Sequence, residues 1–182
     1  MFSKNRLFIQ AVLILTCCLG LPFANAESQP LCYNLSNFHG TYSIVATYGA
    51  NIAMALGTRT VDASGNMTGT FYINEPTTGS TTGARTIVSG TQVGTIAVNC
   101  DGTGVVTRVL TLASGGTVNT FDDFLVTGAI VRNGRLVITQ ITDMTRAPSA
   151  IVPGGIFVFR TWTRVPDWND FLAAIPPLSL PR

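Results

Sequence analysis

The chain has 182 residues, of which 46% are hydrophobic and only 11% are charged, and its formal net charge at pH 7 is +2. Two of its 11 basic residues, Lys4 and Arg6, lie near the N-terminus, so the remainder carries nine Arg against nine Asp and Glu. Such a balance lacks the basic surface of a nucleic-acid-binding protein, and it gives an anionic membrane surface nothing to attract. We therefore expect no nucleic-acid partner.

Residues 1–26 have the pattern of a secretory signal peptide. Lys4 and Arg6 provide a basic start, an apolar run extends from Leu7 to Leu21, and Ala24-Asn25-Ala26 supplies the small residues of a cleavage site. A retained membrane anchor is the less favoured alternative, because the apolar run is shorter than the roughly 20 residues that cross a bilayer. We expect cleavage near Ala26, a secreted or periplasmic protein, and no integral membrane insertion.

Cleavage at that point would leave two of the four cysteines, Cys32 and Cys100. In an exported protein such a pair predicts one disulfide. It would close a loop of roughly 70 residues, which the chain-entropy model values at about 4 kcal/mol. No metal site is expected, because the chain has no C-x-x-C pair and its single histidine cannot complete a four-ligand zinc centre.

From Gly40 to Val165 polar and apolar residues alternate, and the sequence is rich in Thr, Val, Ile and Phe. Clusters of Gly, Asn and Asp interrupt it at short intervals, and Asn133-Gly134 is the favoured two-residue hairpin turn. The pattern predicts strands at 40–49, 51–62, 66–74, 84–90, 92–99, 103–113, 117–131, 135–145 and 156–165.

Eight or nine consecutive strands joined mainly by tight turns predict one all-β domain over residues 27–166. We expect an antiparallel up-and-down barrel, because closure of the sheet removes its free edges. The competing architecture, a two-sheet sandwich, would need long crossover connections, and only Glu75–Gly83 and Arg146–Gly155 are long enough to hold one.

The C-terminal segment, residues 167–182, has a different pattern from the strands. Asp167 is a suitable N-cap, and an apolar stripe follows before Pro176-Pro177 would end a helix. We expect a short C-terminal helix and a proline-rich tail.

Candidate catalytic groups are few. His39 is the only histidine, and no G-x-S-x-G accompanies it, so we expect a residue at the entry of the first strand rather than a catalytic base. Asp122 and Asp123 are adjacent, and adjacent strand residues face opposite sides of a sheet. One of them should therefore point into the barrel with a partner such as Arg160, and Asp143 is a second candidate for an inward or rim position. A buried Asp–Arg pair is structural more often than catalytic.

A resemblance to a known family rests on the first and last predicted strands. Gly40-Thr41-Tyr42 opens the first strand, and Arg160 and Arg164 lie in the last one, "IFVFRTWTRV". This resembles the calycin and lipocalin family, in which a Gly-x-Trp packs at the closed end of the barrel beneath a basic residue of the last strand. The runs "GNMTGT" and "VNCDGTG" also resemble small exported bacterial proteins of unknown role.

The interior of an eight-stranded barrel is either filled by side chains or just wide enough for one small ligand. Our leading hypothesis is an exported, non-enzymatic barrel that binds a small apolar ligand and needs no cofactor. The interior candidates for lining such a site are Tyr42, Tyr48, Met54, Phe71, Arg160 and Trp162.

Three other hypotheses stay open. One is a surface or matrix protein that acts through protein contacts. Another is a cofactor-free cyclase or isomerase resembling the allene oxide cyclases. The last is an outer-membrane barrel, which is less favoured because most strands alternate threonine with aliphatic residues and show no aromatic girdles.

Overall fold

The computed structural model describes residues 32–49, 52–152 and 154–166. The chain divides into two compact units, Met1–Pro30 and Leu31–Arg182, and all described residues belong to the second. The expected signal peptide, residues 1–26, and the expected C-terminal helix and tail, residues 167–182, lie outside the described residues.

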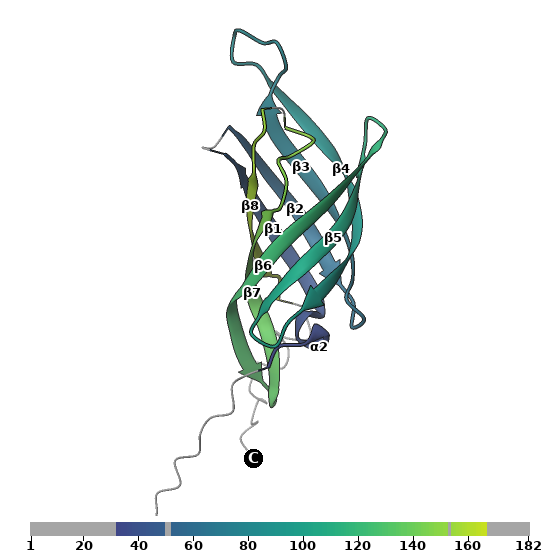
Figure 1. Ribbon diagram of the computed structural model, residues 1–182, viewed down its shortest axis with the longest axis vertical. Coiled ribbons are helices and arrows are strands. Elements are labelled where there is room, and N and C mark those ends of the chain that lie inside the picture. The colour runs from purple at the N-terminus through teal and green to yellow at the C-terminus, as the bar shows by residue number, and fades with distance from the viewer. Residues whose placement is uncertain (1–31, 50–51, 153, 167–182) are drawn as a thin grey trace, which may run out of the picture. The chain divides into compact units, whose positions relative to one another are not determined.

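Eight antiparallel strands close into one barrel (Figure 1). The strands are β1 (Gly40–Tyr48), β2 (Ala53–Val61), β3 (Asn66–Pro76), β4 (Arg85–Val98), β5 (Thr103–Leu112), β6 (Thr117–Arg132), β7 (Arg135–Thr145) and β8 (Val158–Arg164). Each strand pairs with the next one in sequence, and β8 pairs with β1 to complete the ring. The predicted up-and-down barrel is thus confirmed, and a two-sheet sandwich is excluded.

The prediction of two strands at 84–90 and 92–99 is wrong, because both belong to β4. Gly90, at the end of the first predicted strand, pairs with Phe71 of β3 and Leu112 of β5 within a continuous ladder. A Cβ added at Gly90 would come within 2.8 Å of the Phe71 ring. Glycine at this position therefore provides space for an inward aromatic ring instead of forming a turn.

A short helix that the sequence analysis did not predict, α2 (Leu35–Phe38), precedes the barrel. Asn34 caps it, since the Asn34 side chain accepts a hydrogen bond from the Ser36 backbone N–H at 3.0 Å. In return, the Asn34 backbone N–H donates to the Asn37 side chain at 2.8 Å. This reciprocal capping stabilises a helix too short to show a periodic sequence pattern.

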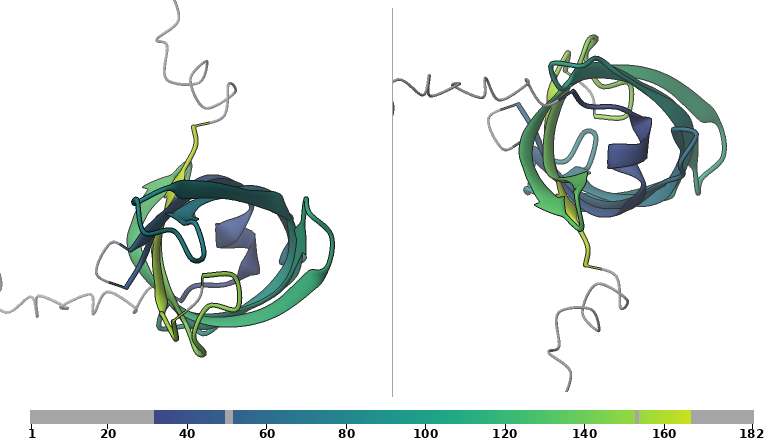
Figure 2. Two further views of the ribbon diagram at one scale, coloured as in Figure 1. Left: turned by 90° about the horizontal axis from the view of Figure 1, so that it is seen from above. Right: turned by 90° about the horizontal axis from the view of Figure 1, so that it is seen from below.

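Helix α2 lies inside the ring of strands and closes one end of the barrel (Figure 2). Phe38 is fully buried and meets Phe124 of β6 edge-to-face, with ring centroids 5.3 Å apart. The Asn37 side chain donates to the backbone carbonyl of Leu136 in β7 at 2.9 Å. The helix is therefore held by contacts with both strands of the β6–β7 hairpin.

A disulfide joins Cys32 to Cys100, as predicted. Cys100 lies in the turn between β4 and β5, and Cys32 lies just before α2. The Tyr33 backbone N–H also donates to the Cys100 carbonyl at 3.1 Å. The bond thus ties the segment that carries α2 to the end of the barrel that α2 closes.

Two apolar clusters lie toward the two ends of the interior. The cluster at the α2 end consists of Phe38, Tyr42, Ile44, Val61, Met67, Ile96, Val106, Phe124, Ile138, Ile141 and Trp162. The cluster at the other end consists of Ala46, Tyr48, Ala53, Ala55, Phe71, Ile73, Leu110, Val152 and Val158. Polar side chains separate them: on β5, for example, Arg108 lies between Val106 of the first cluster and Leu110 of the second.

Candidate functional site

The middle of the barrel holds six buried polar side chains, which we call the charged layer. Its members are Arg59 of β2, Gln92 of β4, Arg108 of β5, Asp122 of β6, Asp143 of β7 and Arg160 of β8. Each is at most 5% exposed. The alternation of strand residues turns all six inward, and closure of the sheet brings distant strands within hydrogen-bonding distance across the interior.

Asp143 joins three strands within the charged layer. Its Oδ1 accepts a hydrogen bond from Arg160 Nε at 2.6 Å. Its Oδ2 accepts from Arg59 Nη1 at 3.0 Å and from Trp162 Nε1 at 2.7 Å. The Arg59 guanidinium also lies over the Trp162 ring, 4.1 Å from the centroid, as in a cation–π contact. Of the two positions predicted for Asp143, inward or at the rim, the structure shows the inward one, with Asp143 1% exposed.

Asp122 holds the other two arginine contacts of the layer. Its Oδ2 accepts from Arg108 Nε at 2.6 Å, and its Oδ1 forms an ion pair with Arg160 Nη2 at 2.5 Å. Burial by itself would raise the pKa of Asp122, but the positive charges of Arg160 and Arg108 outweigh it and hold the pKa below its usual value. The predicted Asp–Arg160 pair is confirmed. Asp123 lies on the outer face, where it pairs with Arg146.

Gln92 bridges the two arginines that face each other across the layer. Its Oε1 accepts from Arg59 Nε at 3.2 Å and from Arg108 Nη1 at 3.1 Å. Burial and the nearby charge of Arg108 lower the pKa of Arg59 to about 9, so that Arg59 is still a cation at neutral pH. The charged layer therefore contains three guanidinium groups and two carboxylates.

Glycines opposite two of the arginines let the strands approach closely. Gly69 of β3 pairs with Arg59, and Gly94 of β4 pairs with Arg108. At either glycine an added Cβ would overlap a carbonyl oxygen of the paired strand, which at Gly94 is the oxygen of Thr107. A residue with a side chain at either position would therefore force the two paired strands apart beside the arginine.

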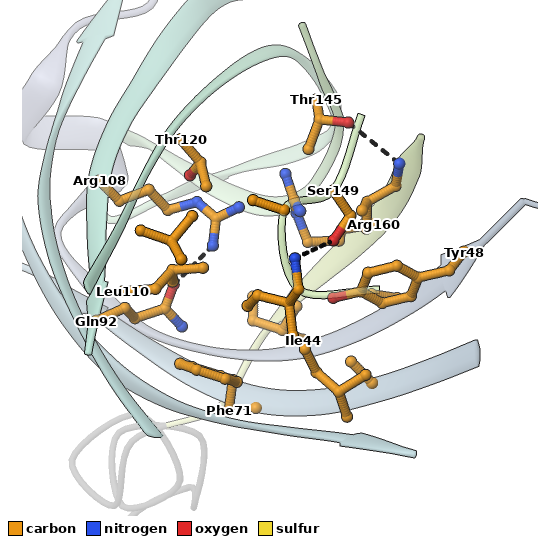
Figure 3. Close-up of a pocket in the computed structure, with 18 of the residues that line it drawn as sticks. Ile44, Tyr48, Phe71, Gln92, Arg108, Leu110, Thr120, Thr145, Ser149 and Arg160 are labelled. Atoms are coloured by element: carbon orange, nitrogen blue, oxygen red, sulfur yellow. Dashed lines mark hydrogen bonds between the residues drawn. The ribbon is translucent and has the colours of Figure 1, made fainter. Parts of the chain in front are cut away.

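A cavity of about 320 Å³ lies between the charged layer and the end of the barrel opposite α2 (Figure 3). Its volume is at the lower end of the range for small-molecule sites. The apolar side chains that line it include Ile44, Ala46, Ala55, Phe71, Ile73, Leu110, Val118 and Val158. Its polar lining includes Tyr48, Arg59, Gln92, Arg108, Thr120, Thr145 and Arg160. Burial raises the pKa of Tyr48, so this side chain presents a neutral hydroxyl.

The connection between β7 and β8 folds over the end of the barrel opposite α2 (Figure 2). Val152 is fully buried in the apolar cluster there, and Ile151 packs against the same cluster. The Ser149 hydroxyl accepts hydrogen bonds from the Ile151 and Val152 backbone N–H groups at 3.2 and 3.1 Å. The Ser149 N–H in turn donates to the Ile156 carbonyl at 2.7 Å. Residues 146–151 consequently form part of the cavity wall.

Three of the side chains predicted to line a ligand site, Tyr48, Phe71 and Arg160, do line the cavity. Tyr42 and Trp162 also face inward, but they pack against each other in the apolar cluster at the α2 end, with ring centroids 5.9 Å apart. Neither contributes to the cavity wall. The part that any of these residues plays in binding stays a prediction.

The expectation that Met54 faces inward is wrong. Met54 lies on the outer face and is 52% exposed, whereas its neighbours Ala53 and Ala55 are buried. Arg59 in the same strand faces inward, and strand residues at an odd separation from an inward residue point outward. Met54 is at such a separation from Arg59. Residue type alone, an apolar methionine, suggested the wrong face.

Arg59, Arg108, Gln92 and Thr120 were not identified from the sequence as parts of the site. For Arg108 a signal is present in the sequence, since Val106 and Leu110 alternate with it and would place it on the inner face. A charged residue on an apolar face is normally assumed to be exposed, so this signal is easily overlooked.

The remaining candidate groups lie outside the cavity. His39 is exposed and forms the C-cap of α2. Within the described ranges, no group of three or more His, Cys, Asp or Glu could hold a metal ion. No helix in the described part of the chain is long and apolar enough to cross a membrane.

At the closed end, the Arg164 guanidinium lies 5.8 Å from the centroid of the Tyr42 ring. The Tyr42 hydroxyl donates to the Phe38 carbonyl at 3.0 Å, so that β8, β1 and α2 meet at this point.

No protein-family model and no curated protein sequence matches this chain.

Proposed function

We propose that the protein is an exported, non-enzymatic barrel that binds one small, mainly apolar ligand in its interior cavity. The observation that carries the proposal is the cavity itself, about 320 Å³ in volume and lined mostly by apolar side chains. A packed barrel of eight strands leaves little free space, so an apolar cavity of this size favours an occupant.

Export is supported by the disulfide and by the sequence pattern of residues 1–26. Disulfides such as Cys32–Cys100 persist in oxidising compartments and are rare in the cytosol. The resemblance to calycin-like barrels is supported by the contact between Tyr42 and Arg164 at the closed end, and it is part of the same proposal.

We do not propose a catalytic function, because the two carboxylates of the charged layer already hold arginines. Asp122 pairs with Arg108 and Arg160, and Asp143 pairs with Arg59 and Arg160. A general base needs a carboxylate that is free to take a proton from a substrate.

The experiment is a titration of the purified protein with N-phenyl-1-naphthylamine, a neutral apolar dye whose fluorescence rises in apolar surroundings. We expect saturable binding of one dye per chain. Ala55→Phe, which fills the cavity, should weaken binding at least tenfold. The matched control is Met54→Phe at the preceding position, where the side chain is 52% exposed on the outer wall and does not line the cavity.

Near-ultraviolet circular dichroism checks that each variant is folded. Ala46→Leu, a smaller change at another residue of the cavity wall, provides a second test if Ala55→Phe does not fold. Absence of saturable binding to the unmodified protein, or unchanged binding by a folded Ala55→Phe protein, would contradict the proposal.

A second candidate function, action through protein contacts, is favoured by apolar side chains on the outer wall. Val45, Leu56 and Tyr72 are cross-strand neighbours on β1, β2 and β3, and the last two are 61% and 58% exposed. Contiguous exposed apolar side chains are typical of contact surfaces. Sedimentation velocity of the unmodified protein and of Leu56→Lys would test for self-association through this wall.

A further inference from the structure

We infer that the cavity takes a ligand with a single negative charge on an apolar body, and that the acidic headgroup lies against Arg108 and Thr120. This inference rests on the proposed function, because it names the chemical class of the occupant of the same cavity. Two independent features of the cavity wall support it, namely the charge of the layer beneath it and an unused hydroxyl group.

The charged layer has one more positive group than negative groups. Asp143 is shared between Arg59 and Arg160, and Asp122 is shared between Arg160 and Arg108. Gln92 contributes an oxygen to Arg108 but no charge. A buried charge without a counter-ion is costly, so an anion beside Arg108 would complete the layer.

Glu75, another buried carboxylate on the inner face, does not fill this role. It lies six residues along β3 from Gly69, which pairs with Arg59. At the rise of a strand this is about 20 Å along β3. Burial raises the pKa of Glu75, although Arg85 at the rim opposes this shift. Glu75 does not line the cavity.

The unused group is the Thr120 hydroxyl. Thr120 of β6 pairs directly with Arg108 of β5 and also lines the cavity. Its Oγ1 is buried and forms no hydrogen bond within the described protein. A buried hydroxyl without a partner is destabilising, and a ligand oxygen that accepts its hydrogen bond would remove that cost.

Figure 3 shows the Arg108 guanidinium and the Thr120 hydroxyl on the same wall of the cavity. A charged donor beside a neutral donor is a suitable site for a carboxylate or sulfate oxygen. Ile44 and Phe71, on another wall, offer no hydrogen-bonding groups from their side chains. The ligand must therefore combine a compact anionic head with an apolar body small enough for the cavity.

The test compares four probes with a ten-carbon chain: decanoate, decyl sulfate, decanol and decyltrimethylammonium. Each is titrated at pH 7.5 to displace bound N-phenyl-1-naphthylamine. We expect decanoate to bind at least tenfold more tightly than decanol, and the cation to bind most weakly. Decyl sulfate should behave like decanoate, because the site recognises the negative charge and not a carboxylate alone.

Two variants assign the preference to the two groups. Arg108→Gln should make decanoate and decanol bind equally. Thr120→Val should weaken decanoate about fivefold and decanol less, because the hydroxyl oxygen of decanol accepts a weaker hydrogen bond than a carboxylate does. Arg135→Gln and Thr107→Val, exposed positions on β7 and β5, are the matched controls and should leave the preference intact. Thr120→Val keeps the side-chain volume, so it tests the inference even if Arg108→Gln fails to fold.

Equal binding of decanoate and decanol would overturn the inference and leave the proposed apolar site standing. A preference for decanoate that survives both substitutions in folded proteins would also overturn it. If the dye and all probes fail to bind, the proposed function falls and the inference falls with it.

Discussion

Substitution of Asp143 by Asn tests whether the charged layer holds the barrel together. The change keeps the size of the side chain but removes the negative charge shared by Arg59 and Arg160. The variant leaves one carboxylate in the charged layer to balance three buried guanidinium groups. Breaking a buried ion pair by removing one partner costs about 3–5 kcal/mol. For a domain of this size the melting temperature should fall by about 6–20 °C.

The matched control is Asp123→Asn, the same chemical change at an exposed ion pair. The side chains of Arg146 and Asp123 are 51% and 44% exposed, and exposed pairs of this kind contribute little to the free energy of unfolding. Urea denaturation of both variants, followed by tryptophan fluorescence and fitted with a common m-value, gives the two free energies. A loss of less than about 1 kcal/mol for Asp143→Asn would refute the view that the layer needs this charge.

Three further predictions concern the closed end, the strand packing and the response to acid. Replacing both Cys32 and Cys100 by Ser should lower the free energy of unfolding by about 4 kcal/mol, because the unfolded chain is no longer constrained by a loop that spans 68 residues. Urea denaturation should give the same loss for the double variant and for the reduced protein. An unchanged free energy of unfolding would contradict this prediction. Gly94→Val should destabilise the barrel by more than about 2 kcal/mol, because its Cβ would overlap the Thr107 carbonyl oxygen, whereas Ala97→Val at an exposed position of β4 should change the melting temperature little. The folded-state pKa of Asp122 lies below its unfolded value of about 3.9, so its contribution is complete above that pH and is lost as the pH falls through the folded value. The free energy of unfolding attributable to Asp122 should therefore be constant from pH 7 to about 5 and fall below about pH 4, and a pH series in urea that shows the same fall for Asp122→Asn would rule this origin out.

The features that the sequence predicts are those set by neighbouring residues. Asn133 and Gly134 adopt positive φ, at 50° and 73°, as their hairpin turn requires, and similar short turns fix the order of the strands. The alternation of strand residues also separates Asp122 from Asp123. Local chemistry of this kind is sufficient to predict a closed meander and one buried acid.

Features that depend on distant contacts were missed. Arg59 and Asp143 are 84 residues apart and meet only because the closed, tilted sheet brings β2 and β7 together across the interior. Helix α2 is too short for a periodic signal, and Met54 was assigned by residue type without the alternation of its strand. The cavity is likewise a property of how side chains from several strands fail to fill the interior.

The charged layer also bears on how this molecule could be altered. It separates the packed end of the barrel, which holds α2 and the disulfide, from the cavity toward the opposite end. Substitutions more than about 7–10 Å apart that share no partners usually combine additively. The cavity wall at Phe71 and Leu110 could thus be redesigned for a different ligand while the α2 end continues to stabilise the fold. The barrel is therefore a suitable scaffold for engineered receptors.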